Sequence, residues 1–203
     1  MNNRIVQSIS NLFHPLLSLT WATLLLVNFT PLVMLPTVTR WFLVGEVFFY
    51  SCMLPSLIFS LLSKIGIVKN GVALRDRKDR VFPLFIYMML CYVQLRVLSV
   101  QGLPDWAMSC YLGGAFLATV FAVVTIWWKI SGHAAGNASV AVASLYLYYL
   151  FPTILPLWVP VVWIVLTGAV ASIRVHLGRH TMAQVTAGML AGALCIVVAN
   201  AFL

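Results

Sequence analysis

Three short segments combine histidine, arginine and lysine in patterns that could carry out chemistry on a phosphate ester. Two of them contain Ser131-Gly132-His133 and the stretch from Arg174 to His180. One imidazole could attack phosphorus while a second protonates the leaving alcohol. The Arg174 guanidinium could hold phosphate oxygens through two parallel hydrogen bonds. These residue types therefore predict hydrolysis of a phosphate ester, with His180 and His133 as the catalytic groups.

The third segment, Arg75-Asp76-Arg77-Lys78-Asp79-Arg80, is strongly basic. All three segments directly precede predicted membrane helices. Arg77 and Arg80 are one helical turn apart and so share a face. Helix amino termini offer unpaired N–H groups and a partial positive charge to anions. We therefore expect the three segments to converge into a phosphate-binding funnel to which arginine side chains contribute. Positioning and electrostatics dominate phosphoryl transfer, so we expect no metal and no cofactor.

Taken in order, residues 75–190 resemble the type 2 phosphatidic acid phosphatase superfamily, which includes membrane lipid phosphatases and vanadium haloperoxidases. Ser131-Gly132-His133 matches the second family motif, with Ile130 in place of the usual proline. Arg174 and His180 keep the spacing of the third motif, and Gly188 follows as it often does in the family.

The resemblance implies a role for each matching residue. His180 would be the nucleophile that forms a phosphohistidine, and His133 the general acid. Arg174 would clamp the phosphate. The Gly132 N–H and the Ser131 hydroxyl would help to hold the oxyanion.

The sequence departs from the family pattern at three places. The first motif normally reads lysine, six residues, Arg-Pro, whereas here Phe82 precedes Pro83. Arg77 and Arg80, with Arg75 and Lys78 behind them, would take the place of its phosphate-binding cations. Ser172 stands two residues before Arg174 instead of one, and Gln184 occupies the position of the aspartate that orients the nucleophile. The Gln184 amide can accept a hydrogen bond from the ring but cannot stabilise imidazolium as a carboxylate would. A comparable Asp to Asn change in a serine protease lowers turnover about 10⁴-fold. The carboxylates that could stand in are Asp76, Asp79 and Glu46.

The composition requires that these segments be positioned by membrane helices. The 203 residues are 63% hydrophobic and 8% charged, with a mean hydropathy of +1.03. About a quarter of a soluble domain is charged, so this chain lacks the polar surface to face water. We predict a single all-α domain over residues 1–203, a polytopic membrane helical bundle. Its expected spans are 14–36, 41–64, 82–101, 105–129, 136–152, 156–173 and 181–203. There are six spans if the proline-interrupted first one is peripheral.

Counting the predicted crossings assigns each loop to one of the two membrane faces, and the basic residues are distributed very unevenly between these faces. One face collects ten of the twelve basic residues: Arg4, Lys64, Lys69, Arg75, Arg77, Lys78, Arg80, Lys129, Arg174 and Arg179. The positive-inside rule makes this the cytoplasmic face, while an anion site would concentrate cations on either face. We expect a multi-pass protein of the cell (inner) membrane with a weak preference for a cytoplasmic site. The basic residues lie at membrane depth, so nucleic-acid binding is not expected.

The expected partner is a membrane lipid phosphate or diphosphate: phosphatidic acid, phosphatidylglycerol phosphate, a polyprenyl diphosphate or a lipid A phosphate. Two alternatives remain open. Gln184 allows a catalytically impaired relative that binds a lipid phosphate without hydrolysing it. Arg96 and Glu46, inside predicted spans, would suit a small lipid or anion transporter. The sequence does not indicate the oligomeric state. His176 matches no motif position and is interpreted as an interface residue or a substrate contact.

Overall fold

The computed structural model describes residues 3–67 and 77–202, and the regular structure in this part of the chain is helical throughout. Short 3₁₀ turns and one π-helical turn interrupt the α-helices. In chain order the elements are α1 (Asn3–Leu12), η1 (Pro15–Leu17), α2 (Ser18–Phe29), η2 (Pro31–Met34), α3 (Thr37–Phe48), η3 (Phe49–Met53), α4 (Leu54–Lys64), α5 (Arg77–Val100), α6 (Asp105–Val124), α7 (Gly132–Leu150), α8 (Trp158–His176) and α9 (Met182–Phe202).

Five helices in the described part of the chain are long and apolar enough to cross a bilayer. They are Thr37–Lys64, which joins α3 to α4, then Asp79–Val100, Asp105–Val124, Trp158–His176 and Met182–Phe202. The protein is therefore a helical, multi-pass membrane protein. Two further predicted spans are helical but are shorter or less apolar than these five. The apolar helix Pro15–Phe29 is shorter, and α7 contains His133, Asn137 and several glycine, serine and tyrosine residues, which lower its hydropathy.

Each predicted span coincides with a helix or a run of helices, but several ends differ. The difference that matters most for the candidate site is the start of α7, which is at Gly132 and not at residue 136. The sequence Gly132-His133 looked like a polar break, yet Ser131 caps the helix and brings both residues into its first turn. α6 ends at Val124, ahead of the predicted 129, and the intervening chain forms a turn. His133 is thus held on a helix instead of in a loop.

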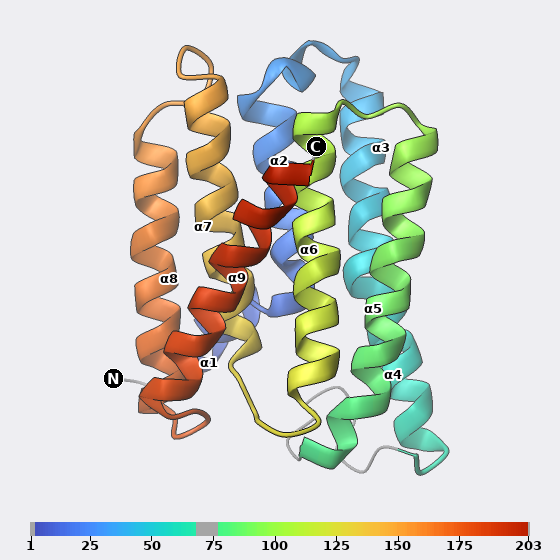
Figure 1. Ribbon diagram of the computed structural model, residues 1–203, viewed down its shortest axis with the longest axis vertical. Helices are drawn as coiled ribbons and strands as arrows, with labels where there is room; N and C mark the ends of the chain where they lie inside the picture. Colours follow the sequence, from blue (N-terminus) through green and yellow to red (C-terminus); the bar gives the residue numbers. More distant parts are fainter. Residues whose placement is uncertain (1–2, 68–76, 203) are drawn as a thin grey trace.

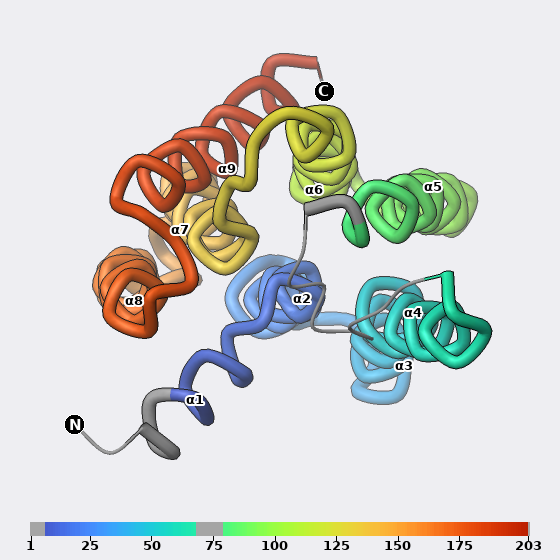
Figure 2. The backbone as a smooth tube through the Cα atoms, turned by 90° about the horizontal axis from the view of Figure 1, so that it is seen from below, coloured from blue at the N-terminus to red at the C-terminus, as the bar shows by residue number. Residues whose placement is uncertain are grey.

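The helices run side by side, and α2 lies near the centre of the bundle (Figures 1 and 2). α7 packs between α8 and α9, α6 packs against α9 and α5, and α3 with α4 lies on the far side of α2 from α8. The N-terminal ends of α5, α7 and α9 and the C-terminal end of α8 lie at the same end of the molecule, the lower end in Figure 1. α1 lies at this end too, beside α8. The predicted convergence of three helix N-termini at one end is therefore present in the fold.

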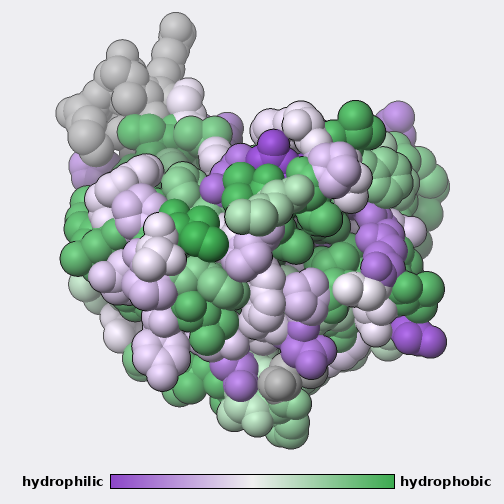
Figure 3. Space-filling model, turned by 90° about the horizontal axis from the view of Figure 1, so that it is seen from above, coloured by the Kyte–Doolittle hydropathy of each residue, from purple (hydrophilic) through white to green (hydrophobic). Residues whose placement is uncertain are grey.

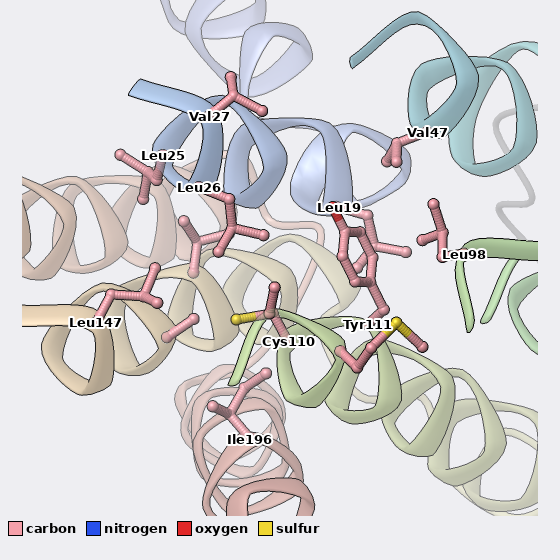
Figure 4. Packing of buried hydrophobic residues seen from close by; sticks show 14 of the residues in the cluster. Leu19, Leu25, Leu26, Val27, Val47, Leu98, Cys110, Tyr111, Leu147 and Ile196 are labelled. Atoms are coloured by element: carbon pink, nitrogen blue, oxygen red, sulfur yellow. The ribbon is translucent and has the colours of Figure 1, made fainter. Parts of the chain in front are cut away.

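The core in the middle of the bundle combines large apolar side chains with close helix contacts. Leu26, Leu98, Tyr111 and Leu147, from four different helices, are each no more than 2% exposed (Figure 4). The Tyr111 hydroxyl lies 3.0 Å from the Thr23 hydroxyl, which satisfies both buried groups. This packing fixes α2, α5, α6 and α7 relative to one another.

Glycines let α9 approach α7 very closely. A Cβ atom added to Gly188 would stand 2.6 Å from the Ser131 carbonyl oxygen. One helical turn later, a Cβ atom on Gly192 would collide with the Ala135 carbonyl oxygen. Small residues four apart are a common way for membrane helices to bring their backbones together. Here they bring the start of α9 against the turn that precedes α7.

Figure 3 shows the end of the molecule away from the N-termini of α5, α7 and α9. Hydrophilic residues are scattered among hydrophobic ones on this surface (Figure 3). Met34 and Val38, beside the start of α3, are 85% and 83% exposed. Exposed apolar side chains of this size suit contact with lipid.

Candidate active site

A cavity of about 180 Å³ lies inside the bundle and reaches the end where the helix N-termini meet. Five residues singled out from the sequence line this cavity: His133, His180, Arg80, Arg174 and Gly132. Its apolar lining comes from mid-helix positions of α2, α6, α7 and α9, such as Ala22, Ala118, Ala143 and Ile196. The cavity therefore joins a cationic, histidine-containing end to a hydrocarbon-like interior.

The turn before α7 is fixed by Ser131. Its hydroxyl accepts a hydrogen bond from the Ala134 N–H at 3.5 Å, and its own N–H donates to the Gln184 carbonyl at 3.1 Å. Ser131 is fully buried and does not line the cavity. The structure thus gives its hydroxyl a capping role at α7, and its contact with an oxyanion stays a prediction. The Gly132 backbone, by contrast, does line the cavity.

Gln184 serves two groups at the start of α9. Its side-chain Oε1 accepts from the Thr181 N–H at 3.2 Å, and the Thr181 hydroxyl accepts from the Gln184 N–H at 3.3 Å. This reciprocal pair is a capping box, in which threonine and glutamine three residues apart satisfy each other's backbone donors. The same Oε1 lies 3.2 Å from Nδ1 of His180. Gln184 therefore holds the His180 ring and the end of α9 with one oxygen atom.

This geometry determines the tautomer of His180. The Thr181 backbone N–H can only donate, so the Gln184 atom that it meets must be the amide oxygen. Because that oxygen can only accept, Nδ1 of His180 must carry the proton that joins them. In the neutral ring, Nε2 then keeps its lone pair. An imidazole with a bare Nε2 is the form that a nucleophile requires.

The surroundings of His180 favour its neutral form. Burial lowers its pKa from 6.5 to about 4, and the nearby charges of Arg174, Arg80 and Lys129 act in the same direction, while the Gln184 hydrogen bond opposes them. His180 is 7% exposed. The same three cations create a positive field that would attract a phosphate group. The ring is thus uncharged at neutral pH and lies in a cationic environment.

Arg174 reaches the cavity from the last turn of α8. Its Nη1 donates to the Ser10 hydroxyl at 3.0 Å, and its Nε is buried with no hydrogen-bond partner among the residues that the structure describes. A buried donor without a partner is costly, so it marks a place where an acceptor would be stabilised. A phosphate oxygen is such an acceptor.

The structure adds residues to the site that sequence reasoning did not identify. His14 lines the cavity with its ring centroid 5.1 Å from that of His133 in an edge-to-face arrangement. Ser10, on α1, contacts Arg174. Only the tertiary fold brings these two residues to α7 and α8, so no local spacing could have revealed them. Thr181, in contrast, was readable, because Thr181 and Gln184 have capping-box spacing.

Several predicted residues lie elsewhere or cannot be placed. The side chains of Arg77 and Lys78, and all of Asp76, lie outside the described residues. Asp79 does not line the cavity. Both carboxylate oxygens of Glu46 accept hydrogen bonds from the Gln101 side chain at 2.9 Å. Gln101 follows the C-terminal end of α5, which is the end away from His180 (Figure 1), so Glu46 does not orient His180. Arg96 and His176 are exposed and outside the cavity lining.

Three histidines line this cavity, but in the described part of the chain they do not belong to a group of side chains that could hold a metal ion. Across residues 3–67 and 77–202, no three His, Cys, Asp or Glu side chains are grouped closely enough to hold a metal ion. Cys52, Cys91, Cys110 and Cys195 are all free thiols.

Comparisons of the chain with protein-family models, with curated proteins and with solved structures gave no match. Fold and site together define a multi-pass helical membrane protein with a cavity lined by histidine and arginine at one end.

Proposed function

We propose that this protein is a lipid phosphate phosphatase with the fold and chemistry of the type 2 phosphatidic acid phosphatase superfamily. It removes phosphate from a phosphomonoester or diphosphate of a membrane lipid through a phosphohistidine on His180. One observation carries the proposal: a neutral His180 with a bare Nε2 lines the same cavity as His133, Arg80 and Arg174.

The two histidines divide the work between a nucleophile and an acid. Nε2 of His180 attacks phosphorus, an N–P bond forms, and the bond from phosphorus to the lipid oxygen breaks. The negative charge of the bound phosphate favours protonation of the buried His133, which gives its proton to that oxygen, so the lipid leaves as an alcohol or, from a diphosphate, as a monophosphate. Water then attacks phosphorus and gives a proton to His133, the N–P bond breaks, and inorganic phosphate leaves. Arg80, Arg174 and the Gly132 N–H bind the phosphoryl oxygens throughout.

The apolar part of the cavity supports a lipid substrate over a soluble phosphate ester. Its lining residues come from the interiors of helices that cross or pack within the membrane domain. A hydrocarbon chain would therefore find apolar contacts while its phosphate stays at the cationic end. Phosphatidic acid, phosphatidylglycerol phosphate, a polyprenyl diphosphate and a lipid A phosphate all have this form. We infer seven crossings, with Pro15–Phe29 and α7 as the first and fifth, in the cell (inner) membrane and with the site on its cytoplasmic face.

Release of inorganic phosphate tests the proposal. The purified protein in detergent is given each of these lipids with a metal chelator present, beside His180→Ala and His133→Ala. The matched control is His176→Ala, which removes an exposed histidine outside the cavity. We expect release from at least one lipid, its loss in both site variants, and no change in the control. Release that survives in His180→Ala would contradict the proposed nucleophile.

A second candidate is a lipid-phosphate-binding protein without turnover, and Gln184 favours it. Its oxygen is shared between a helix cap and His180, so it supplies orientation but no negative charge to imidazolium. Such a protein would bind a lipid phosphate and release no phosphate in this assay. A transporter would instead move the lipid, and the two residues that suggested one, Arg96 and Glu46, lie away from the cavity.

A further inference from the structure

The last turn of α1 and the chain that joins it to α2 pack directly onto the cationic end of the cavity. The Asn137 side chain donates to the Phe13 carbonyl at 3.2 Å and to the His133 carbonyl at 2.7 Å, which ties the segment to the first turn of α7. The His133 ring hydrogen-bonds to the backbone of Ser10. Pro15 lies against Gly132, where an added Cβ atom would be 3.5 Å away. Residues 10–15 are therefore in contact with both the α7 turn and the α8 end of the site.

Ser10 makes the most specific contact in this segment. It is fully buried, and its hydroxyl accepts from Nη1 of Arg174 at 3.0 Å. In a guanidinium group, Nη1 lies away from the edge formed by Nε and Nη2. The bond to Ser10 therefore holds the side of Arg174 away from that edge. Nε on this edge is buried and has no hydrogen-bond partner in the described part of the chain.

An Nε–Nη2 edge is one of the two bidentate faces that arginine offers to phosphate. A guanidinium free to rotate would lose this alignment, because binding would first have to order it. A buried neutral hydroxyl, bonded to the opposite nitrogen, fixes the orientation before the anion arrives. The orphaned Nε and the held Nη1 point to the same binding geometry.

We propose that Ser10 is a positioning residue of the anion site, which holds Arg174 so that its Nε–Nη2 edge receives a phosphate group. α1 and the segment after it are then a functional wall of the site and not only a peripheral anchor. This inference rests on the proposed function in one respect, that the anion is the phosphate of the substrate. It concerns binding and not turnover, so the two can be tested separately.

The test measures binding of inorganic phosphate to the purified full chain in detergent by isothermal titration calorimetry, in the wild type and in Ser10→Ala. We expect the dissociation constant to rise about tenfold in Ser10→Ala, as for loss of a hydrogen bond to a charged group. The matched control is Ser8→Ala, which removes an exposed serine from the same helix and should bind as the wild type does. Equal affinity of Ser10→Ala and wild type would overturn the proposal.

A double-variant cycle separates positioning from a general structural effect. Lysine at position 174 keeps the charge but has no bidentate edge to orient. In Arg174→Lys, a further Ser10→Ala change should leave the phosphate affinity unchanged, whereas losses that add would contradict a link through Arg174. Wild-type protein that binds no phosphate would also overturn the inference. If it binds phosphate but hydrolyses no lipid, only the phosphatase proposal fails, and the comparison of variants still decides the role of Ser10.

Discussion

At the scale of single residues, the position of the proton on His180 controls what the site can do. The backbone N–H of Thr181 orients the Gln184 amide, and the amide oxygen in turn requires a proton on Nδ1. We predict that ¹⁵N NMR of histidine-labelled protein shows His180 as the Nδ1–H tautomer, neutral down to about pH 4, where its pKa lies. The signal is assigned by its loss in His180→Asn. An Nε2–H tautomer would contradict the account.

The same pKa predicts how the stability of the protein depends on pH. Unfolded protein protonates this histidine as the pH falls through 6.5, whereas folded protein keeps it neutral until about pH 4. The contribution of His180 to stability is therefore complete above pH 6.5 and is lost as the pH falls from 6.5 towards 4. The loss should be smaller in His180→Asn, measured as the unfolding temperature in detergent. An identical slope in both proteins would contradict the depressed pKa.

Replacing Gln184 by glutamate isolates the effect of negative charge. Glutamate has the same length and also fits the third position of a capping box, so the helix cap is kept. A carboxylate on Nδ1 stabilises imidazolium, so we expect the pKa of His180 to rise and phosphate release to increase at least about tenfold. Gln184→Ala, which removes both functions, should lower phosphate release and unfold at lower temperature. Unchanged or slower release in Gln184→Glu would contradict the role assigned to this contact.

At the scale of elements, the contact between α9 and the turn before α7 sets the relative position of His133 and His180, the two histidines proposed to be catalytic. Gly188→Ala would place a methyl group 2.6 Å from the rigid Ser131 backbone. We expect a loss of about 1 to 3 kcal/mol in the free energy of unfolding and a marked drop in phosphate release. Gly168→Ala is the control, because a Cβ atom there meets nothing within 4 Å. Equal stability and activity of the two variants would show that this contact does not position the site.

Much of the element pattern followed from the sequence, because apolar runs and polar breaks report the helices of a membrane domain directly. The start of α7 did not, since a capping serine extended the helix through Gly132 and His133. His133, Arg174, His180 and Gln184 were found from motif spacing, which records residues that act together. Ser10 and His14 had no such signal, because their contacts arise only when the first segment folds back on α7 and α8.

At the scale of the whole molecule, the fold assigns the loops to two ends, and this can be tested in membranes. Single cysteines are introduced in place of exposed Ile67 and His176 at the cavity end and Thr37 and Thr153 at the other end, in a background without native cysteines. A membrane-impermeant maleimide should label the first pair from the cytoplasmic side and the second pair from the opposite side. Labelling of residues 67 and 176 from different sides would contradict the bundle topology. Exchange of the two pairs would contradict only the cytoplasmic orientation.

Trapping the proposed phosphohistidine shows whether His180 carries the phosphoryl group. Protein is mixed briefly with a lipid carrying a ³²P-labelled terminal phosphate, quenched in alkali and digested, and the labelled peptide is identified by mass spectrometry. We predict label on His180, absent from His180→Ala and retained in His176→Ala. Phosphate release without label on His180, or label on another residue, would contradict it.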